Sequence, residues 1–351
     1  MKNYTNLCLG IFISMLWSSA FAHHSSAPHF DHDNPIIVEG SFTEIKLVNP
    51  HAYIYFTSNE SGDTEDWRCE LTSATQLGRW GWSAGMFSPG QKLTISGSPA
   101  RREDNHCYMS SIELADGTEI SRNADLSDMQ DVVAAAANAP VQQERAKFLA
   151  NGQSNIEGAW ITRSFGRGGE GTSPQFAATE TGEVAVGGYE MAFDDPILSC
   201  HPVNIFSGWN HDENINDISI DGNVITLQYG FMDFVRTVHM NMSEHPSNIV
   251  PSTGGHSIGS WEGDTLVVDT IGFEEGVLSH RSGMKHSDQM EVFERIRVDA
   301  DTGYLLRDYY VNDPLYLVGE VHGQDLMSPS DAPYSPYSCV ELSGDNNIRQ
   351  E

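Results

Sequence analysis

Positive charge is scarce in this sequence. Its 351 residues include 19 lysines and arginines against 49 aspartates and glutamates, which gives a formal net charge of −30. A surface this acidic repels phosphate backbones and anionic membranes, so we expect no nucleic-acid partner. The acidic residues are spread along the chain instead of forming one tail, which indicates an adaptation for solubility or salt.

Long apolar runs are lacking beyond the N-terminus, so we expect no membrane insertion. The N-terminus carries one charge, Lys2, before an apolar run from Leu7 to Trp17, and small residues follow. This order is typical of a secretory signal peptide over residues 1–22, cleaved after Ala22. The apolar run is too short for a good membrane anchor. We therefore expect a soluble protein that is periplasmic or secreted.

Cysteine is rare, and one of the five cysteines, Cys8, lies in the expected signal peptide. The other four are Cys69, Cys107, Cys200 and Cys339. An even number in an exported protein predicts two disulfides, although free buried cysteines are the alternative. Three pairings are open, and we favour Cys69–Cys107 and Cys200–Cys339 because each pair stays within one expected domain. The chain has no Cys-x-x-Cys pair, which argues against a zinc ribbon or a thioredoxin-type motif.

The length predicts about two domains. Residues 23–123 have the pattern of three strands, a short helix over 72–86 and two further strands, which is the order of an OB-like barrel. The third and fifth strands of such a barrel are neighbours, and this independently favours the Cys69–Cys107 pair. The alanine-rich residues 124–154 predict a helical linker.

Residues 155–345 predict a second, larger β domain. Turn signals such as Asp221-Gly222, Glu262-Gly263-Asp264 and Asp301-Thr302-Gly303 separate short strands. Strands at such spacing, without a long helical pattern, favour a lipocalin-like antiparallel barrel or a sandwich. The predicted fold class is therefore all-β and mainly antiparallel, with a small OB-like barrel, a helical linker and a lipocalin-like barrel.

Two parts of the sequence resemble known families. His23-His24-Ser25, Asn49-Pro50-His51 and Trp67-Arg68-Cys69-Glu70 resemble an exported proteobacterial family of unknown function, whose mature chains begin with Ala-His-His-Ser. The segment from His256 to Phe273, with WEGDTLVVDT inside it, resembles an exported bacterial β-barrel family that is common in genomes degrading unusual organic compounds. The resemblances imply export and architecture, and they imply no particular activity.

Candidate catalytic residues gather in the second domain. Asp269 ends an apolar strand, where burial of a carboxylate is costly unless the group is paired or used. An Asp–His pair suits a general base, so we expect Asp269, His256 and His286 to form an acid/base group. Arg236 and Arg295 are candidate anchors for an anionic group or a developing oxyanion. The full set of substrate-binding candidates is Arg236, Arg295, Glu294, His239 and Trp261.

The same residues also fit a structural role, because Glu294 and Arg295 can form an ion pair and surface carboxylates abound. The functional interpretation is a protein that binds a small organic molecule and converts it by acid/base chemistry, as a lyase, isomerase, cyclase or hydrolase, with no cofactor required. Residues 255–259 read GHSIG and not Gly-x-Ser-x-Gly, which disfavours a serine nucleophile. A non-catalytic lipid or glycan carrier is an alternative.

Copper binding is a further alternative. Cleavage after Ala22 makes His23 the first residue, and its α-amino group and imidazole can chelate one metal ion together. His51 is the preferred third nitrogen donor, and such a site suits copper. A frayed, histidine-rich tail without metal is the competing interpretation. The sequence leaves the substrate, the direction of the reaction and the oligomeric state undefined.

Overall fold

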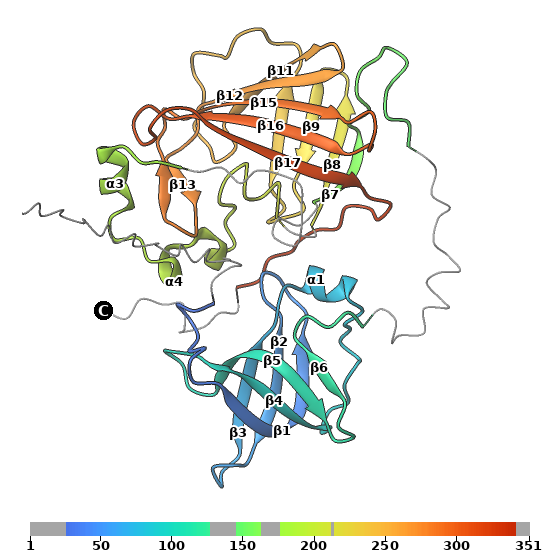
Figure 1. Ribbon diagram of the computed structural model, residues 1–351, viewed down its shortest axis with the longest axis vertical. Coiled ribbons are helices and arrows are strands. Elements are labelled where there is room, and N and C mark those ends of the chain that lie inside the picture. The colour runs from blue at the N-terminus through green and yellow to red at the C-terminus, as the bar shows by residue number, and fades with distance from the viewer. Residues whose placement is uncertain (1–25, 127–144, 163–175, 212–213, 342–351) are drawn as a thin grey trace, which may run out of the picture.

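The computed structural model describes residues 26–126, 145–162, 176–211 and 214–341. The chain forms a small N-terminal barrel and a larger C-terminal barrel, as Figure 1 shows. The predicted all-β class is confirmed. No helix in these described ranges is long and apolar enough to cross a membrane. The signal peptide predicted over residues 1–22 lies outside them.

The small domain is one sheet that closes on itself. Its elements are β1 (Ile36–Lys46), β2 (Tyr53–Ser58), β3 (Glu65–Glu70), α1 (Ala74–Arg79), β4 (Lys92–Pro99), β5 (His106–Leu114) and β6 (Glu119–Ser121). The strand order is β3-β2-β1-β4-β5-β6, and a parallel pairing of β3 with β5 completes the OB-like arrangement. Helix α1 is shorter than predicted. Ser73 caps its start by accepting a hydrogen bond from the backbone N–H of Gln76, and Gly81, with a φ of 78°, turns the chain just after its end.

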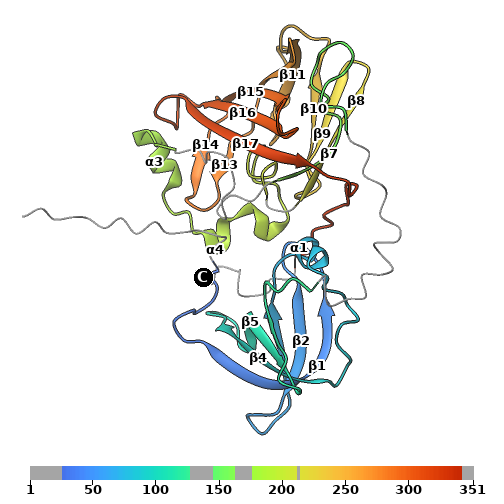
Figure 2. The ribbon, with the colours of Figure 1, turned by 45° about the vertical axis from the view of Figure 1, so that its right-hand side comes forward.

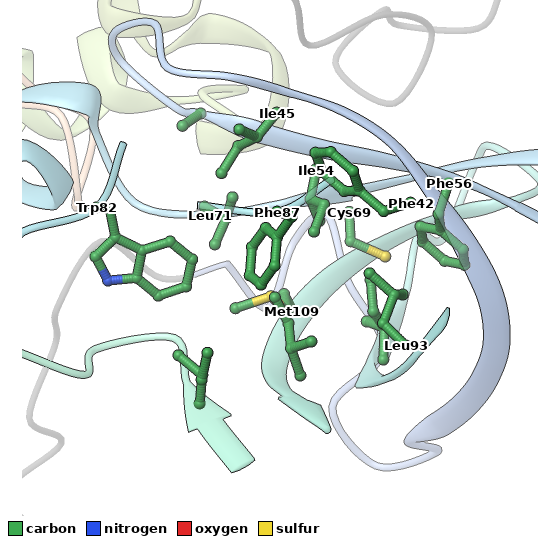
Figure 3. Packing of buried hydrophobic residues seen from close by; sticks show 14 of the residues in the cluster. Phe42, Ile45, Ile54, Phe56, Cys69, Leu71, Trp82, Phe87, Leu93 and Met109 are labelled. Carbon is green, nitrogen blue, oxygen red and sulfur yellow. The ribbon is translucent and has the colours of Figure 1, made fainter. Parts of the chain in front are cut away.

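Alternating residues of these strands build the core of the small domain. Ile54 and Phe56 of β2 point inward and pack with Trp82 and Phe87 from the connection after β3 (Figure 3). Each such side chain contributes about 1.5–3 kcal/mol by leaving water. The Cys69–Cys107 disulfide lies in this core and joins paired residues of β3 and β5, so that predicted pairing is confirmed.

Nine strands close the larger barrel in the order β10-β11-β12-β15-β16-β17-β7-β8-β9. They are β7 (Gly158–Thr162), β8 (Ile215–Asp221), β9 (Val224–Gln228), β10 (Val235–His239), β11 (His256–Glu262), β12 (Thr265–Ile271), β15 (Glu291–Val298), β16 (Leu305–Asn312) and β17 (Val321–Pro329). Gly222, Gly263 and Gly303 have positive φ at the three predicted turns, where glycine avoids steric cost. Neighbours are antiparallel except at β10–β11, which is a parallel pair.

Several short elements lie beside the larger barrel, and α4 among them lies toward the small domain (Figures 1 and 2). They are α3 (Glu180–Val186), α4 (Met191–Asp194), the 3-10 helix η1 (Pro196–Ser199), β13 (Gly276–Ser279) and β14 (Met284–His286). The Arg102 guanidinium of the small domain stacks on the Phe193 ring of α4 at 4.6 Å. Residues 145–154, the described end of the expected helical linker, form turns and a Phe148–Ser154 bridge instead of a helix.

The C-terminal segment after β17 returns to the small domain (Figure 2). The side-chain amide of Asn49 donates to the backbone oxygen of Tyr337 at 2.5 Å, and the backbone oxygen of Asn49 accepts from the Val340 N–H at 2.6 Å. The predicted Cys200–Cys339 disulfide, also confirmed, ties the same segment to the larger barrel. The asparagine of the Asn-Pro-His motif therefore holds the two domains together.

We expect Asn49→Ala and Val340→Pro each to weaken the contact between the domains, because each removes a hydrogen bond between Asn49 and this segment. Loss of one such bond weakens association by roughly tenfold. A specific protease site is inserted within residues 127–144, and cleavage there breaks the covalent link between the domains. Size-exclusion chromatography at decreasing protein concentration then measures how tightly the two fragments associate. Asn151→Ala, which alters an exposed local hydrogen bond, is the control. If both variants dissociate at the same concentration as the parent protein, the hydrogen bonds of Asn49 do not hold the domains together.

Candidate functional site

A buried network of charged side chains occupies the interior of the larger barrel. Arg236 of β10 donates to both carboxylate oxygens of Glu294 on β15, at 2.6 and 3.2 Å. Arg307 of β16 contacts the same Glu294 at 3.4 Å and donates from Nε to Asp325 of β17 at 2.8 Å. None of these four residues is more than 2% exposed. The interior that we expected to receive a ligand is thus filled by ion pairs and by the surrounding apolar core.

The two arginines and two carboxylates balance each other's charge. Burial disfavours ionisation of Glu294, but Arg236 and Arg307 outweigh it, so the pKa of Glu294 is lowered. Burial likewise opposes the charged form of Arg236, but Glu294 outweighs it and the pKa of Arg236 is raised. For Asp325 burial prevails over Arg307, and its pKa is raised. The hydroxyl groups of Tyr229, Ser257 and Thr270 accept further hydrogen bonds from the Nη atoms of Arg236.

Several predicted substrate-binding residues therefore have other partners. Arg236 and Glu294 form an ion pair with each other in the barrel interior. Arg295 lies on the outer face and pairs with Glu262 at 2.8 Å, so the suggested Glu294–Arg295 pair is wrong. Trp261 is half-buried and packs against the barrel core.

The outer face of the same barrel brings together an aspartate and three histidines. His245, in the connection between β10 and β11, has Nε2 at 3.5 Å from Oδ2 of Asp269 on β12. Its Nδ1 atom is 2.9 Å from Nδ1 of His256 on β11. The ring of His239 on β10 stacks on His256, with centroids 5.0 Å apart. We name Asp269, His245, His256 and His239 the histidine cluster.

The geometry of the histidine cluster restricts where protons reside. Two Nδ1 atoms at 2.9 Å need one donor and one acceptor. With both rings neutral and the His245 Nε2–H directed at the Asp269 carboxylate, His245 Nδ1 accepts from His256 Nδ1–H. His256 Nε2 is then unprotonated and is a base. The distance of 3.5 Å between His245 Nε2 and the Asp269 carboxylate is too long for a good hydrogen bond, so the orienting effect of Asp269 is modest.

The environment keeps His256 neutral near pH 7. Burial lowers the pKa of the His256 imidazole, and the positive charges that His245 and His239 can carry lower it further. The Asp269 carboxylate is half-exposed and adjoins His245 instead of His256. A neutral imidazole is the form that accepts a proton.

A pocket of about 330 Å³ opens beside His256 and His239. Strands β10 and β11 pair at only Val238–Ser257 and His239–Ile258, so their first residues diverge. Residues 234–237 and 252–257 form the walls of this wedge. Gly255 has a φ of +63°, and a Cβ there would lie 2.8 Å from the backbone oxygen of Ile271, so glycine is needed at the wall.

The predicted catalytic group is split by the fold. His256 and Asp269 belong to the histidine cluster, and His245, which the sequence did not single out, lies between them. His286 is buried in β14, where its ring meets the edge of Phe273, and burial lowers its pKa. It has no contact with the histidine cluster among the interactions that the described residues make.

The copper site predicted from His23 and His51 stays a prediction, because His23 lies outside the described residues. His51 Nδ1 lies 3.4 Å from Oε1 of Glu70, which also accepts from the Tyr53 hydroxyl. Within the described part of the chain, no three His, Cys, Asp or Glu side chains are placed to hold a metal ion.

Comparison with protein families finds that residues 12–108 match a family of unknown function, DUF6152. The match covers the chain through the start of β5 and leaves the larger barrel unmatched. It agrees with the resemblance stated for the N-terminal part, while the resemblance of the second barrel to another family is not confirmed. The chain matches no protein in the curated collection that was searched.

We expect Glu294→Gln to lower the free energy of unfolding by about 3–5 kcal/mol, because it leaves two buried guanidinium groups with one carboxylate. Urea denaturation followed by circular dichroism measures the loss. Glu291→Gln changes an exposed glutamate on the same strand and should have little effect. A Glu294 variant as stable as the parent protein would show that the network is not stabilising.

Proposed function

We propose that the protein binds a small polar organic molecule in the wedge pocket between β10 and β11 and moves a proton on it, with His256 as the general base. The observation that carries this proposal is the contact chain from Asp269 through His245 to His256 beside that pocket. The site lies at the seam of the barrel and not in its interior. No redox cofactor is required for such a reaction.

The proposed roles follow from position and charge. His256 Nε2 accepts the proton, and His245 shares the resulting positive charge through the paired Nδ1 atoms. Asp269 is a positioning residue for His245. His239 supports the ring of His256 by stacking. Arg236 also lines the pocket, but its guanidinium charge is already balanced by Glu294, so it does not supply a free anchor for an anion.

Proton transfer to a positioned imidazole fits eliminations, isomerisations and hydrations of substrates with an acidic C–H or O–H group. The walls of the pocket combine hydroxyl groups of Ser252, Thr253 and Thr237 with the Phe234 ring. Such walls suit a ligand that is partly polar and partly apolar. A carrier that binds the same ligand without changing it is the competing function, and turnover distinguishes the two.

We also propose that the protein is exported. The two disulfides are compatible with an oxidising compartment such as the periplasm or the extracellular space. The predicted signal peptide supports the same location.

Kemp elimination of a nitrobenzisoxazole tests for the proposed base. A base removes the carbon-bound proton, the N–O bond breaks, and a coloured cyanophenolate forms. We expect His256→Ala to lower the protein-dependent rate by about a hundredfold or more, and Asp269→Asn to lower it less because that contact is long and half-exposed. His322→Ala is the matched control, since His322 lies 3.5 Å from Asp308 but does not line this pocket. Equal rates for His256→Ala and the parent protein would exclude His256 as the base.

The same reaction has an expected pH dependence. The rate should rise with pH through an apparent pKa below the ordinary histidine value of about 6.5, because burial and the neighbouring histidines favour neutral His256. His245→Gln removes one of the neighbouring positive charges, so the rising limb should move to higher pH. Stopped-flow absorbance over pH 4–8 measures both profiles. If the rise of the rate with pH moves to lower pH in His245→Gln, the charge of His245 does not lower the pKa of His256.

A further inference from the structure

The turn before β10 is held by the C-terminal segment of the chain. The Asp233 carboxylate in this turn accepts hydrogen bonds from the Tyr334 hydroxyl at 2.6 Å, the Tyr337 N–H at 2.7 Å and the Ser338 N–H at 2.9 Å. The Tyr337 ring is buried and meets the edge of Phe231 in the same turn. We name residues 334–340 the C-terminal strap.

The backbone of this turn is strained. Met232 and Asp233 both lie in the left-handed region, with φ of 59° and 52°, although neither is glycine. Non-glycine residues adopt this region at a cost in free energy, and they persist there when surrounding contacts impose it. The bonds from the strap to Asp233 are contacts of this kind. Burial raises the pKa of Asp233, but the Tyr334 hydroxyl and the two N–H groups outweigh it, so the pKa is lowered.

The turn leads directly into a wall of the wedge pocket. Phe234, Val235 and Arg236 follow Asp233 and line the pocket. The same strand ends at His239, which stacks on His256. β10 is paired with β9 along its whole length but with β11 at only two positions, so its place relative to β11 depends on contacts outside that pair, such as those of the turn.

The strap is also anchored away from the pocket. Asn49 of the small domain binds Tyr337 and Val340, and Cys339 is bonded to Cys200. Asn49 does not line the pocket. The contacts form a continuous path from the small domain through the strap and Asp233 to β10.

We propose that Asp233 is a positioning residue for the wedge pocket and that the small domain, acting through the C-terminal strap, sets the position of β10 beside His256. This inference rests on the proposed function for the meaning of the pocket, but the coupling itself is measurable without turnover. It gives the small domain a role in the site although it supplies none of the side chains that line the pocket.

Hydrogen exchange followed by mass spectrometry on the full chain tests the coupling. Asp233→Gly removes the carboxylate and keeps a residue that tolerates the left-handed backbone. We expect peptides covering the strap and residues 234–239 to exchange roughly tenfold faster or more, which is the effect of losing hydrogen bonds to a charged acceptor. Asn49→Ala should change the same peptides in the same direction to a smaller extent. Asp221→Asn, an exposed aspartate in the β8–β9 turn, is the control that changes charge alone.

The titration of His256, observed by NMR of labelled histidine rings, is the second readout. We expect its midpoint to move in Asp233→Gly, because the His239 ring that faces it moves with β10. The proposal is overturned if the strap peptides of Asp233→Gly exchange faster while residues 234–239 do not. It is also overturned if the strap peptides of Asp233→Gly exchange no faster than those of the parent protein. If Asp233→Gly speeds exchange at residues 234–239 but the parent protein catalyses no Kemp elimination, His256 is not the base and the positioning role of Asp233 stands. If the protein catalyses the elimination but exchange at residues 234–239 does not change, the base stands and the positioning role fails.

Discussion

The larger barrel depends on one buried carboxylate. Glu294 lies between Arg236 and Arg307, and these arginines come from strands on either side of it in the closed sheet. A buried guanidinium is costly without a partner, so Arg236, Arg307, Glu294 and Asp325, which pairs with Arg307, depend on one another. The network thereby links β10 with β15 and β16 across the barrel interior. The side chains of the network and of the surrounding core occupy the part of the interior where we expected a ligand.

Because the charged network occupies the interior, the site that we propose lies at the seam between β10 and β11. An antiparallel barrel is uniform around its circumference, but the parallel β10–β11 pair interrupts that regularity. The long connection that a parallel pair requires carries His245 back over the outer face, where it meets His256. The divergence of the strands and the histidine cluster thus have one topological cause.

Much of the fold followed from local pattern. The period of two in TLVVDT puts Leu266, Val268 and Thr270 on one face of the strand and Asp269 on the other. The structure buries the first three and exposes Asp269, whereas its predicted catalytic role implied a sheltered position. The disulfides followed from the domain assignment. The partner of Glu294 could not be found this way, because it depends on which strands meet when the barrel closes. His245 was missed because it lies in a connection without periodicity, and only the path of that connection brings it to Asp269.

The strap gives the two domains a second point of attachment. Domains joined by one linker can rotate freely about it, and such motion is the usual expectation for modest interfaces. Here the covalent connection runs through residues 127–144, and Asn49 also binds the C-terminal strap by hydrogen bonds and an isolated bridge to Cys339. Rotation of the small domain about its covalent connection would break the hydrogen bonds of Asn49 with Tyr337 and Val340, so these bonds oppose such rotation.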